Sequence, residues 1–398
     1  MTEQAKVPTI RFAGFTDPWE QRKLGDVASS FDYGLNAAAT EYDGQNKYLR
    51  ITDIDDETHE FSKSDLTTPL ADLAMSADYL LKEGDLLFAR TGASVGKTYL
   101  YRQFDGMVYF AGFLIRARIG EGADPEFAYQ ATLTDAYKKY VAITSQRSGQ
   151  PGVNAQEYAD YQLMLPSKTE QQQIGMTLRS LDDLITLHQR KYDKLVILKK
   201  SMLEKMFPKD GESVPEIRFA GFTDPWEQRK ASEVFQIVDD RGHPTLPVLS
   251  ATQNQGMIYR DDSGRYIGHD ESNEIGYKRV LPGDFVVHLR SFQGGFAHSQ
   301  YEGITSPAYT VFRAKEPTSH SDRFWKHWFM SEHFIAGLST VTYGIRDGRS
   351  ISVDEFMNTF LAFPAVEEQA AISRLFDYLD DLITLHQRKL ELLQNIKK

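Results

Sequence analysis

The sequence LDDLITLHQRK occurs twice in this chain, at residues 181–191 and 379–389. A second string, RFAGFTDPWEQRK, also occurs twice, at residues 11–23 and 218–230. Each copy of the second string precedes a copy of the first, and the segments between them differ. This repetition predicts two structurally related halves, because like repeats tend to pack around a pseudo-twofold axis.

Around each LDDLITLHQRK copy, apolar residues recur at alternating spacings of four and three, which is typical of a coiled-coil seam. The first helix should begin after Pro166, end before Pro208 and span about 57 Å; the second should begin after Pro364. The alternative is that each helix packs only on its neighbouring domain. We expect antiparallel pairing through Leu178, Leu181, Ile185, His188, Tyr192 and Leu195 of the first helix and Phe376, Leu379, Ile383, His386, Leu390 and Leu393 of the second.

The segments between the repeated strings, about residues 24–165 and 231–363, differ in sequence but share one order of features. Each has a Gly-Asp turn, an apolar strand, a Gly-rich polar loop, further strands, an aromatic helix and a second polar loop. One framework with different loops would suit two readers of different targets. We expect variable domains at residues 1–165 and 211–363, and spacer helices at 166–210 and 364–398.

Composition is that of a globular protein: 41% of the 398 residues are hydrophobic and 25% are charged. We expect a soluble chain, because no run of 18 apolar residues could cross a membrane and the N-terminal residues lack a secretory signal pattern. Cysteine is absent, which excludes disulfides, thiolate zinc sites and a cysteine nucleophile. These features are compatible with a cytoplasmic location.

The net charge of −11 counts against a nucleic-acid partner. The charge is unevenly distributed, however. Residues 86–118 hold Arg90, Lys97, Arg102, Arg116 and Arg118 against a single aspartate. Such a local basic face could bind phosphates while the whole chain stays acidic, with weak binding by this chain alone and a steep dependence on salt.

Two patterns that could carry chemistry fail on spacing or geometry. TGASVGKT, at residues 91–98, looks like a phosphate-binding loop, but only three residues separate Gly92 from Gly96 and the segment leads into a strand. The aspartate pairs at 182–183 and 380–381 are adjacent on a helix, so they should not converge on one metal ion and should be surface charges. We therefore predict no catalytic residue and no metal site.

The whole chain resembles the specificity subunit of type I restriction-modification enzymes. IRFAGFTDPWEQRKLGDV at residues 10–27 is similar to the domain opening of that family. LPSKTEQQQI at 165–174 and FPAVEEQAAI at 363–372 resemble the family's entry into its conserved helices, and LDDLITLHQRK resembles the helix itself. Each motif is weak alone, but together, twice and in order, they span nearly the entire chain.

The resemblance implies a non-catalytic DNA-reading subunit of α+β class. Two α/β target recognition domains would be joined by two long conserved helices that form an antiparallel coiled coil, giving a pseudo-twofold tandem repeat. Each domain would read half of a bipartite target in double-stranded DNA, and the helices would fix the gap. Two modification subunits would dock and carry S-adenosylmethionine, and restriction subunits would use ATP and magnesium. This chain would hold no cofactor.

Base reading requires polar or basic side chains on exposed loops. For any single arginine the alternative is a structural salt bridge or a solvated charge. Arg346 and Arg349 are favoured because their loop, TYGIRDGRS, has little apolar content. The candidate DNA contacts are Arg90, Ser94, Lys97, Arg102, Gln146, Arg147 and Gln150 in the first domain, and Arg241, His243, Arg290, Gln293, His298, Tyr343, Arg346 and Arg349 in the second.

Two other classes of function compete with DNA recognition. The acidic net charge suits a protein-interaction scaffold in which the coiled coil is a plain spacer. An enzyme with an unrecognised site is the third possibility. Binding of a cofactor by the isolated chain would favour the enzyme, and binding to a DNA duplex with a methyltransferase partner would separate the first two hypotheses.

Overall fold

In the computed structural model, the chain forms two compact units. Residues 1–187 and 391–398 form the first unit, and residues 188–390 form the second. The boundaries therefore fall inside both long helices. The structure describes residues 8–56, 58–147, 149–209, 211–252, 255–263, 271–288, 296–338, 342–343, 350–351 and 353–397.

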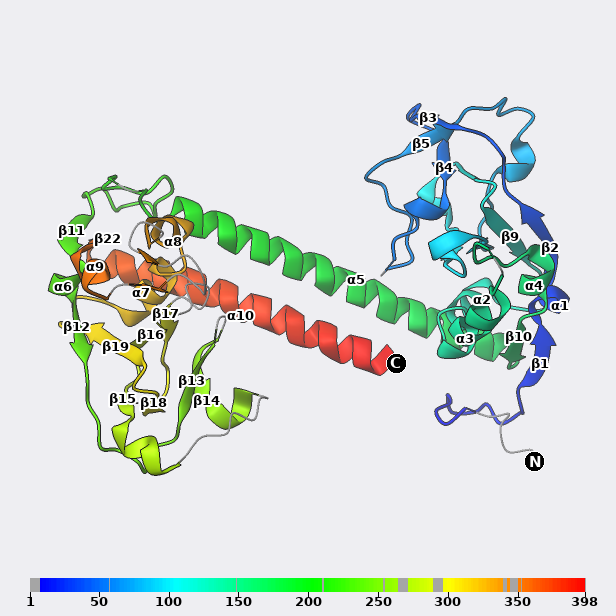
Figure 1. The fold of residues 1–398 in the computed structure, drawn as a ribbon. Coiled ribbons are helices and arrows are strands. Elements are labelled where there is room, and N and C mark those ends of the chain that lie inside the picture. The colour runs from blue at the N-terminus through cyan, green and yellow to red at the C-terminus, as the bar shows by residue number, and fades with distance from the viewer. Residues whose placement is uncertain are drawn as a thin grey trace. The chain divides into compact units, whose positions relative to one another are not determined.

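The first unit is built on a four-stranded antiparallel sheet in the order β2-β9-β6-β7, of which Figure 1 labels β2 and β9. One of the two central strands, β6, is buried on both faces: Leu86 and Phe88 meet the helices, whereas Leu87 and Ala89 meet the smaller strands and loops. This explains why its sequence is a continuous apolar run and not an alternating one. The elements are β1 (Glu20–Lys23), α1 (Leu24–Val27), β2 (Ala28–Tyr33), β3 (Ala39–Glu41), β4 (Lys47–Leu49), β5 (Thr67–Pro69), β6 (Asp85–Ala89), β7 (Thr98–Leu100), β8 (Val108–Phe110), β9 (Leu114–Ile119), α2 (Pro125–Ala131), α3 (Asp135–Thr144), α4 (Ala155–Ala159), β10 (Gln162–Leu165) and α5 (Lys168–Lys205).

The second unit repeats this architecture with the sheet β12-β19-β16-β17. Its core is rich in aromatic side chains, including Phe235, Phe312, Trp325 and Phe329. The elements are β11 (Glu227–Lys230), α6 (Ala231–Val234), β12 (Phe235–Val238), β13 (Leu249–Thr252), β14 (Gly256–Tyr259), β15 (Lys278–Val280), β16 (Phe285–His288), β17 (Phe296–His298), β18 (Gly303–Thr305), β19 (Tyr309–Ala314), α7 (Asp322–Trp328), α8 (Glu332–Leu338), β20 (Thr342–Tyr343), β21 (Ser350–Ile351), α9 (Val353–Asn358), β22 (Phe360–Phe363) and α10 (Val366–Lys397).

The repeated RFAGFTDPWEQRK string closes each variable domain onto its spacer helix. Its last four residues form β1 and β11, which pair antiparallel with β10 and β22, the strands that lead into α5 and α10. The first arginine of the string forms a bidentate ion pair with a glutamate at the start of the helix. Arg11 binds Glu170 through two hydrogen bonds of 2.7 Å, and Arg218 binds Glu368 with the same two distances.

A glutamine next to each of these glutamates ties the spacer helix to the variable domain. Gln171 donates to the carbonyl of Pro166 at 2.9 Å and accepts from the backbone amide of Asp124 at 2.8 Å, at the start of α2. Gln369 makes the equivalent bonds to Pro364 and Ser321 in the second unit. The Glu-Gln pair of the helix-entry motif is therefore an attachment point in both copies.

The two long helices are antiparallel, as predicted, and Figure 1 shows them as α5 and α10. In the second unit, Lys199 bonds Asp380 at 2.5 Å, and His188 Nδ1 lies 2.7 Å from His386 Nδ1. In the first unit, Lys397 pairs with Asp182. Residue numbers rise along one helix as they fall along the other, and His188 and His386 occupy equivalent places in the repeat. The predicted α+β class, with two α/β domains and two long antiparallel helices in a tandem repeat, is confirmed.

Two residues assigned to the helix seam, Phe376 and Leu379, are also part of the core of the second unit. Phe376 is fully buried, stacks on Phe207 at 5.8 Å between ring centroids and lies 5.1 Å from the His327 ring. Leu379 is part of the same cluster. The cluster also contains Leu203 of α5 and Met206 and Phe207, which directly follow that helix, so at this end of α10 both pairing with α5 and packing on the variable domain bury the helix. Every helix in the described part of the chain is too short or too polar to span a membrane.

The histidine pair predicts that acid weakens the second unit. Burial lowers the pKa of both His188 and His386, and the neighbouring Lys191 and Lys389 lower it further. The folded pKa values thus lie below the unfolded value of about 6.5, so as the pH falls the unfolded chain binds protons first and stability declines. When the pH is lowered from 7.5 to 5.5, the melting temperature of the wild-type protein should fall. The melting temperature of His386→Gln should fall by less over the same pH range. An equal fall in both proteins would contradict this prediction.

Candidate nucleic-acid interface

Two polar loops of the first variable domain form one continuous surface. The loop at residues 90–97 connects β6 to β7, and the loop at residues 145–154 connects α3 to α4. Gly92 donates its amide to the carbonyl of Pro151 at 3.0 Å, and Val153 donates to the carbonyl of Arg90 at 3.0 Å. Both loops hold candidate contacts predicted from the sequence, and these backbone bonds bring the loops together.

Two buried tyrosines fix the backbone of the first loop through hydrogen bonds from the domain core. The Tyr158 hydroxyl donates to the carbonyl of Ala89 at 2.7 Å and accepts from the amide of Gly96 at 3.1 Å. The Tyr137 hydroxyl donates to the carbonyl of Gly96 at 3.1 Å. Burial raises the pKa of both tyrosines, so both stay protonated donors. Gly96 has a φ of +83°, and a Cβ there would lie 2.5 Å from a Val141 methyl carbon, so the turn requires glycine.

Arg90 is the arginine best placed for contact with a ligand. Its guanidinium carbon lies 5.0 Å from the centre of the Tyr33 ring, which is 45% exposed. No hydrogen bond or ion pair occupies this guanidinium in the part of the chain that the structure describes. A stacked guanidinium keeps its in-plane N–H donors available, which suits bonding to phosphate or to a base edge.

The remaining candidates of these two loops differ in how free they are. Gln146 and Gln150 are exposed, and Ser94 is half-buried. Arg147 is exposed but donates to the carbonyl of Thr144 at 2.8 Å and pairs with Glu157. Two exposed aromatic residues beside Arg90, Tyr33 and Phe113, were missed by the sequence analysis. Their only sequence signal was an aromatic residue next to a glycine at the end of a strand run.

Four of the five cations in residues 86–118 are neutralised by carboxylates, which corrects the predicted basic face. Arg102 is only 9% exposed and pairs with Glu60 and Glu126, and Lys97 pairs with Asp56 at 2.6 Å. Because these groups are committed to structural ion pairs, we remove Arg102 and Lys97 from the candidate set. The other pairs are Arg116 with Asp32 at 2.7 Å and Arg118 with Asp85 at 3.0 Å.

In the second variable domain, four of the predicted contacts lie outside the described residues: Arg290, Gln293, Arg346 and Arg349. Tyr343 lies in β20, which pairs with β21 and so brackets the predicted TYGIRDGRS loop. Arg241 is exposed and pairs with Asp239 at 2.6 Å, and His243 bonds Asp240 at 2.8 Å. His298 is 8% exposed and bonded to Asp322 at 2.7 Å, so it is also removed from the set.

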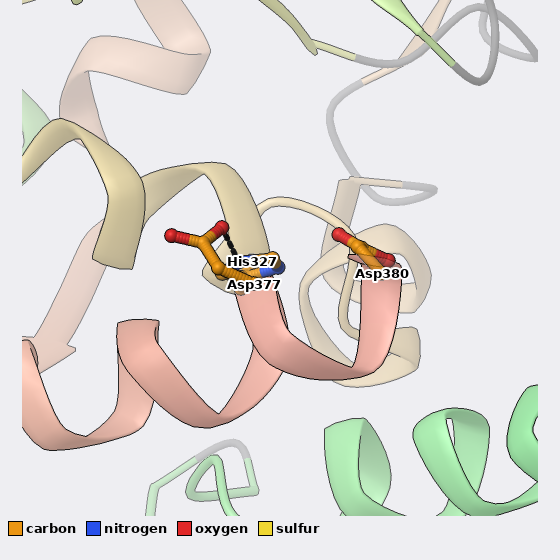
Figure 2. A group of neighbouring side chains, drawn as sticks. All are labelled: His327, Asp377 and Asp380. Carbon is orange, nitrogen blue, oxygen red and sulfur yellow. Dashed lines mark hydrogen bonds and ion pairs between the residues drawn. The ribbon is translucent and has the colours of Figure 1, made fainter. Parts of the chain in front are cut away.

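One cluster of side chains in the second unit has the composition of a metal site. His327 on α7 lies beside Asp377 and Asp380 on α10, with ligand atoms within 4.8 Å of one another (Figure 2). Three cations already neutralise these two carboxylates. Lys326 lies 3.4 Å from each, Arg323 lies 3.2 Å from Asp377, and Lys199 bonds Asp380. We therefore assign the cluster as an ion-pair network between α7, α10 and α5.

The charge states of this network follow from its surroundings. Burial lowers the pKa of His327, so the ring is neutral and its Nε2 bonds Asp377 at 3.0 Å. Burial alone would raise the pKa of Asp377, but the His327 hydrogen bond and the nearby cations lower it to about 2. The network corrects the expectation that Asp380 is a plain surface charge.

Comparison with known proteins agrees with the resemblance in the sequence. The family model described as the type I restriction modification DNA specificity domain matches residues 16–196. The type I restriction enzyme MjaVIII specificity subunit of Methanocaldococcus jannaschii is 22% identical over 403 residues, covering 96% of this chain and 91% of that protein. A second specificity subunit of that organism is 21% identical with the same coverage.

The fold also matches a solved structure. The S subunit of a type I restriction-modification system from M. genitalium has a TM-score of 0.58 at 10% identity, covering 98% of this chain and 96% of that one. That likeness extends over both units, and the repeated strings extend the family signature beyond the residues that the family model matches. Residues 16–196 therefore carry a type I restriction modification DNA specificity domain, and over nearly its whole length the chain is similar to specificity subunits of type I restriction-modification enzymes, whose catalysis lies in partner subunits.

Proposed function

We propose that each variable domain contacts one half of a bipartite target in double-stranded DNA, and that α5 and α10 set the gap between the halves. One observation links this function to a particular residue, Arg90. In the first domain, Arg90 is stacked on Tyr33 with no ion-pair partner among the described residues, at the edge of two loops that buried tyrosines hold rigid. A rigid loop edge with free donors is the arrangement that base reading needs.

The partners follow from the charge and from the repeat. Because the net charge is −11, this chain should bind DNA weakly alone and tightly only with partners that add basic surface. Two equivalent spacer segments offer two equivalent docking places, so we propose two modification subunits per chain. These would carry S-adenosylmethionine, and restriction subunits would use ATP and magnesium. Such a complex would act in the cytoplasm, where bacterial and archaeal DNA lies.

The function is tested by expressing the chain with its modification subunit in cells that lack other adenine methylation. Sequencing of N6-methyladenine should then reveal one split motif with a constant gap. A duplex carrying that motif should bind the purified complex more tightly than a duplex with either half scrambled. A continuous motif would overturn the two-reader arrangement, and no motif with no duplex binding would favour the protein-interaction scaffold.

Arg90→Ala should weaken binding of the complex to its target by about 1–3 kcal/mol if the guanidinium contacts a base edge. The loss should be confined to the half-site read by the first domain. Arg22→Ala is the matched control, because Arg22 is an exposed arginine of β1 that pairs only with nearby Glu20 among the residues described. Binding is measured by titration of labelled duplex at fixed salt. Equal affinity of Arg90→Ala and wild type would remove Arg90 from the interface.

A further inference from the structure

A single aspartate of α10 joins three helices in the second unit. Asp380 accepts from Lys199 of α5 at 2.5 Å and lies 3.4 Å from the ammonium of Lys326, on α7 of the variable domain. Lys199 is nearly buried and Asp380 is less than a third exposed. One carboxylate therefore links the variable domain, its own spacer helix and the opposite spacer helix. We call Lys326, Asp380 and Lys199 junction 2.

The first unit has the same connection. Asp182 of α5 accepts from Gln130 of α2 at 2.8 Å and pairs with Lys397 of α10. Gln130 is buried and sits in the short helix that corresponds to α7. We call Gln130, Asp182 and Lys397 junction 1. Asp182 and Asp380 occupy the same place in the repeated LDDLITLHQRK string, and Lys199 and Lys397 follow at the same spacing, so the two copies share these two members of the junction, whereas the third comes from the variable domain.

Each junction is the second of two polar attachments along a spacer helix, and in the second unit the apolar contact of Phe376 and Leu379 lies between them. The first point is the Glu-Gln pair at the helix start, where Glu368 binds Arg218 and Gln369 binds the start of α7. Asp380 follows Glu368 by twelve residues, which is about 18 Å along the helix axis. Directional polar contacts about 18 Å apart restrict tilting and rotation of the domain on the helix more than the apolar contact between them does alone.

We infer that Asp182 and Asp380 are positioning residues that fix the angle of each variable domain on the helix pair and thereby restrict the gap between the two DNA half-sites. This rests on the proposed function. The carboxylates do not contact DNA themselves, and they act through α2 and α7. Charge-assisted bonds of partly buried groups are directional enough for this role.

The two junctions differ in charge, which allows each to be tested separately. Junction 1 uses a neutral amide, Gln130, whereas junction 2 uses the ammonium of Lys326, reinforced by the bond from His327 to Asp377. Lys326→Met keeps the aliphatic stem and removes the ion pairs with Asp380 and Asp377. Lys199→Met removes the opposite-helix bond. Lys194→Met is the matched control, because Lys194 is an exposed lysine of the same α5 helix.

The experiment measures affinity of the complete complex for duplexes whose half-sites are constant and whose gap is the native length or one base pair shorter or longer. Wild type should prefer the native gap strongly. In Lys326→Met this preference should fall about tenfold or more, with discrimination against a mismatch inside either half-site unchanged. Lys326→Arg should restore the preference. Lys194→Met should behave as wild type. A destabilised but correctly positioned domain would lose total affinity without losing gap preference.

The outcomes separate this inference from the function on which it rests. If wild type recognises no split target, the proposed function fails. If wild type is selective for gap length and both Lys326→Met and Lys199→Met keep the same selectivity, the positioning role is overturned while the function stands. Should Lys326→Met fail to fold, Gln130→Ala in the first unit is the second test, with the same expected loss of gap preference and the same overturning result.

Discussion

Glu368→Ala should lower the free energy of unfolding of the second unit by about 3–5 kcal/mol, the usual cost of leaving one partner of a buried ion pair alone. Glu368 is 1% exposed and Arg218 is 13% exposed, and two 2.7 Å bonds join them. Without the carboxylate, the guanidinium stays in an environment that cannot solvate it. Urea unfolding followed by tryptophan fluorescence is a suitable measurement, because three of the four tryptophans, Trp226, Trp325 and Trp328, lie in this unit.

The neighbouring residue provides the control. Glu367 is exposed on the same helical turn, so Glu367→Ala should change stability by less than about 0.5 kcal/mol. The double variant Arg218→Met with Glu368→Leu should recover most of the loss, because an apolar pair of similar volume often replaces a buried ion pair without cost. A Glu368→Ala protein as stable as Glu367→Ala would show that Arg218 finds water or another partner.

The equivalent ion pair of the first unit, between Arg11 and Glu170, could not be predicted from the sequence. Ser167-x-x-Glu170 has the pattern of a capping box, in which the glutamate side chain would bond the Ser167 amide. In the structure the Ser167 hydroxyl accepts from the Glu170 amide at 3.4 Å, but the Glu170 carboxylate binds Arg11. A local pattern could not reveal a partner more than 150 residues away in sequence. The helix itself was predictable, because its apolar period is a local property of consecutive residues.

The same distinction applies to the candidate interface. The two polar loops were predictable from their glycines and polar residues, which are local signals. Their contact with each other depends on backbone hydrogen bonds between distant residues, such as Gly92 to Pro151. The sequence could not distinguish Arg90 from Arg102. Both lie in the same basic stretch, and only the fold brings Glu60 and Glu126 to Arg102 and leaves Arg90 stacked on Tyr33. Identifying a free arginine requires knowing where the carboxylates are.

The internal neutralisation also resolves the conflict between an acidic chain and a DNA partner. A count of lysines and arginines overestimated the basic face, because most of them hold the domain together. Specificity can come from a few unpaired donors on rigid loops, while affinity comes from partner subunits. A subunit built in this way reads sequence without binding strongly to every duplex, since nonspecific affinity depends on the number of phosphates that it neutralises.

Inserting one heptad after His188 and one after His386 should lengthen the gap in the recognised DNA by about three base pairs. The two histidines face each other, so the inserted segments should face each other too, and seven residues preserve the seam. Seven residues add about 10.5 Å of helix, and base pairs are about 3.4 Å apart. Sequencing of N6-methyladenine in cells expressing the variant should show unchanged half-sites and a longer gap.

The same variant should bind the original target about 100-fold more weakly or worse. One domain would be displaced from its half-site, and each lost base pair costs about 1–3 kcal/mol. An insertion in α5 alone is the control: it leaves a heptad without a partner and shifts Lys199 away from Asp380, so binding to every gap length should fall. If the double insertion left the gap unchanged, the separation of the half-sites would have to be set by the partner subunits, and the helix pair would serve only to dock them.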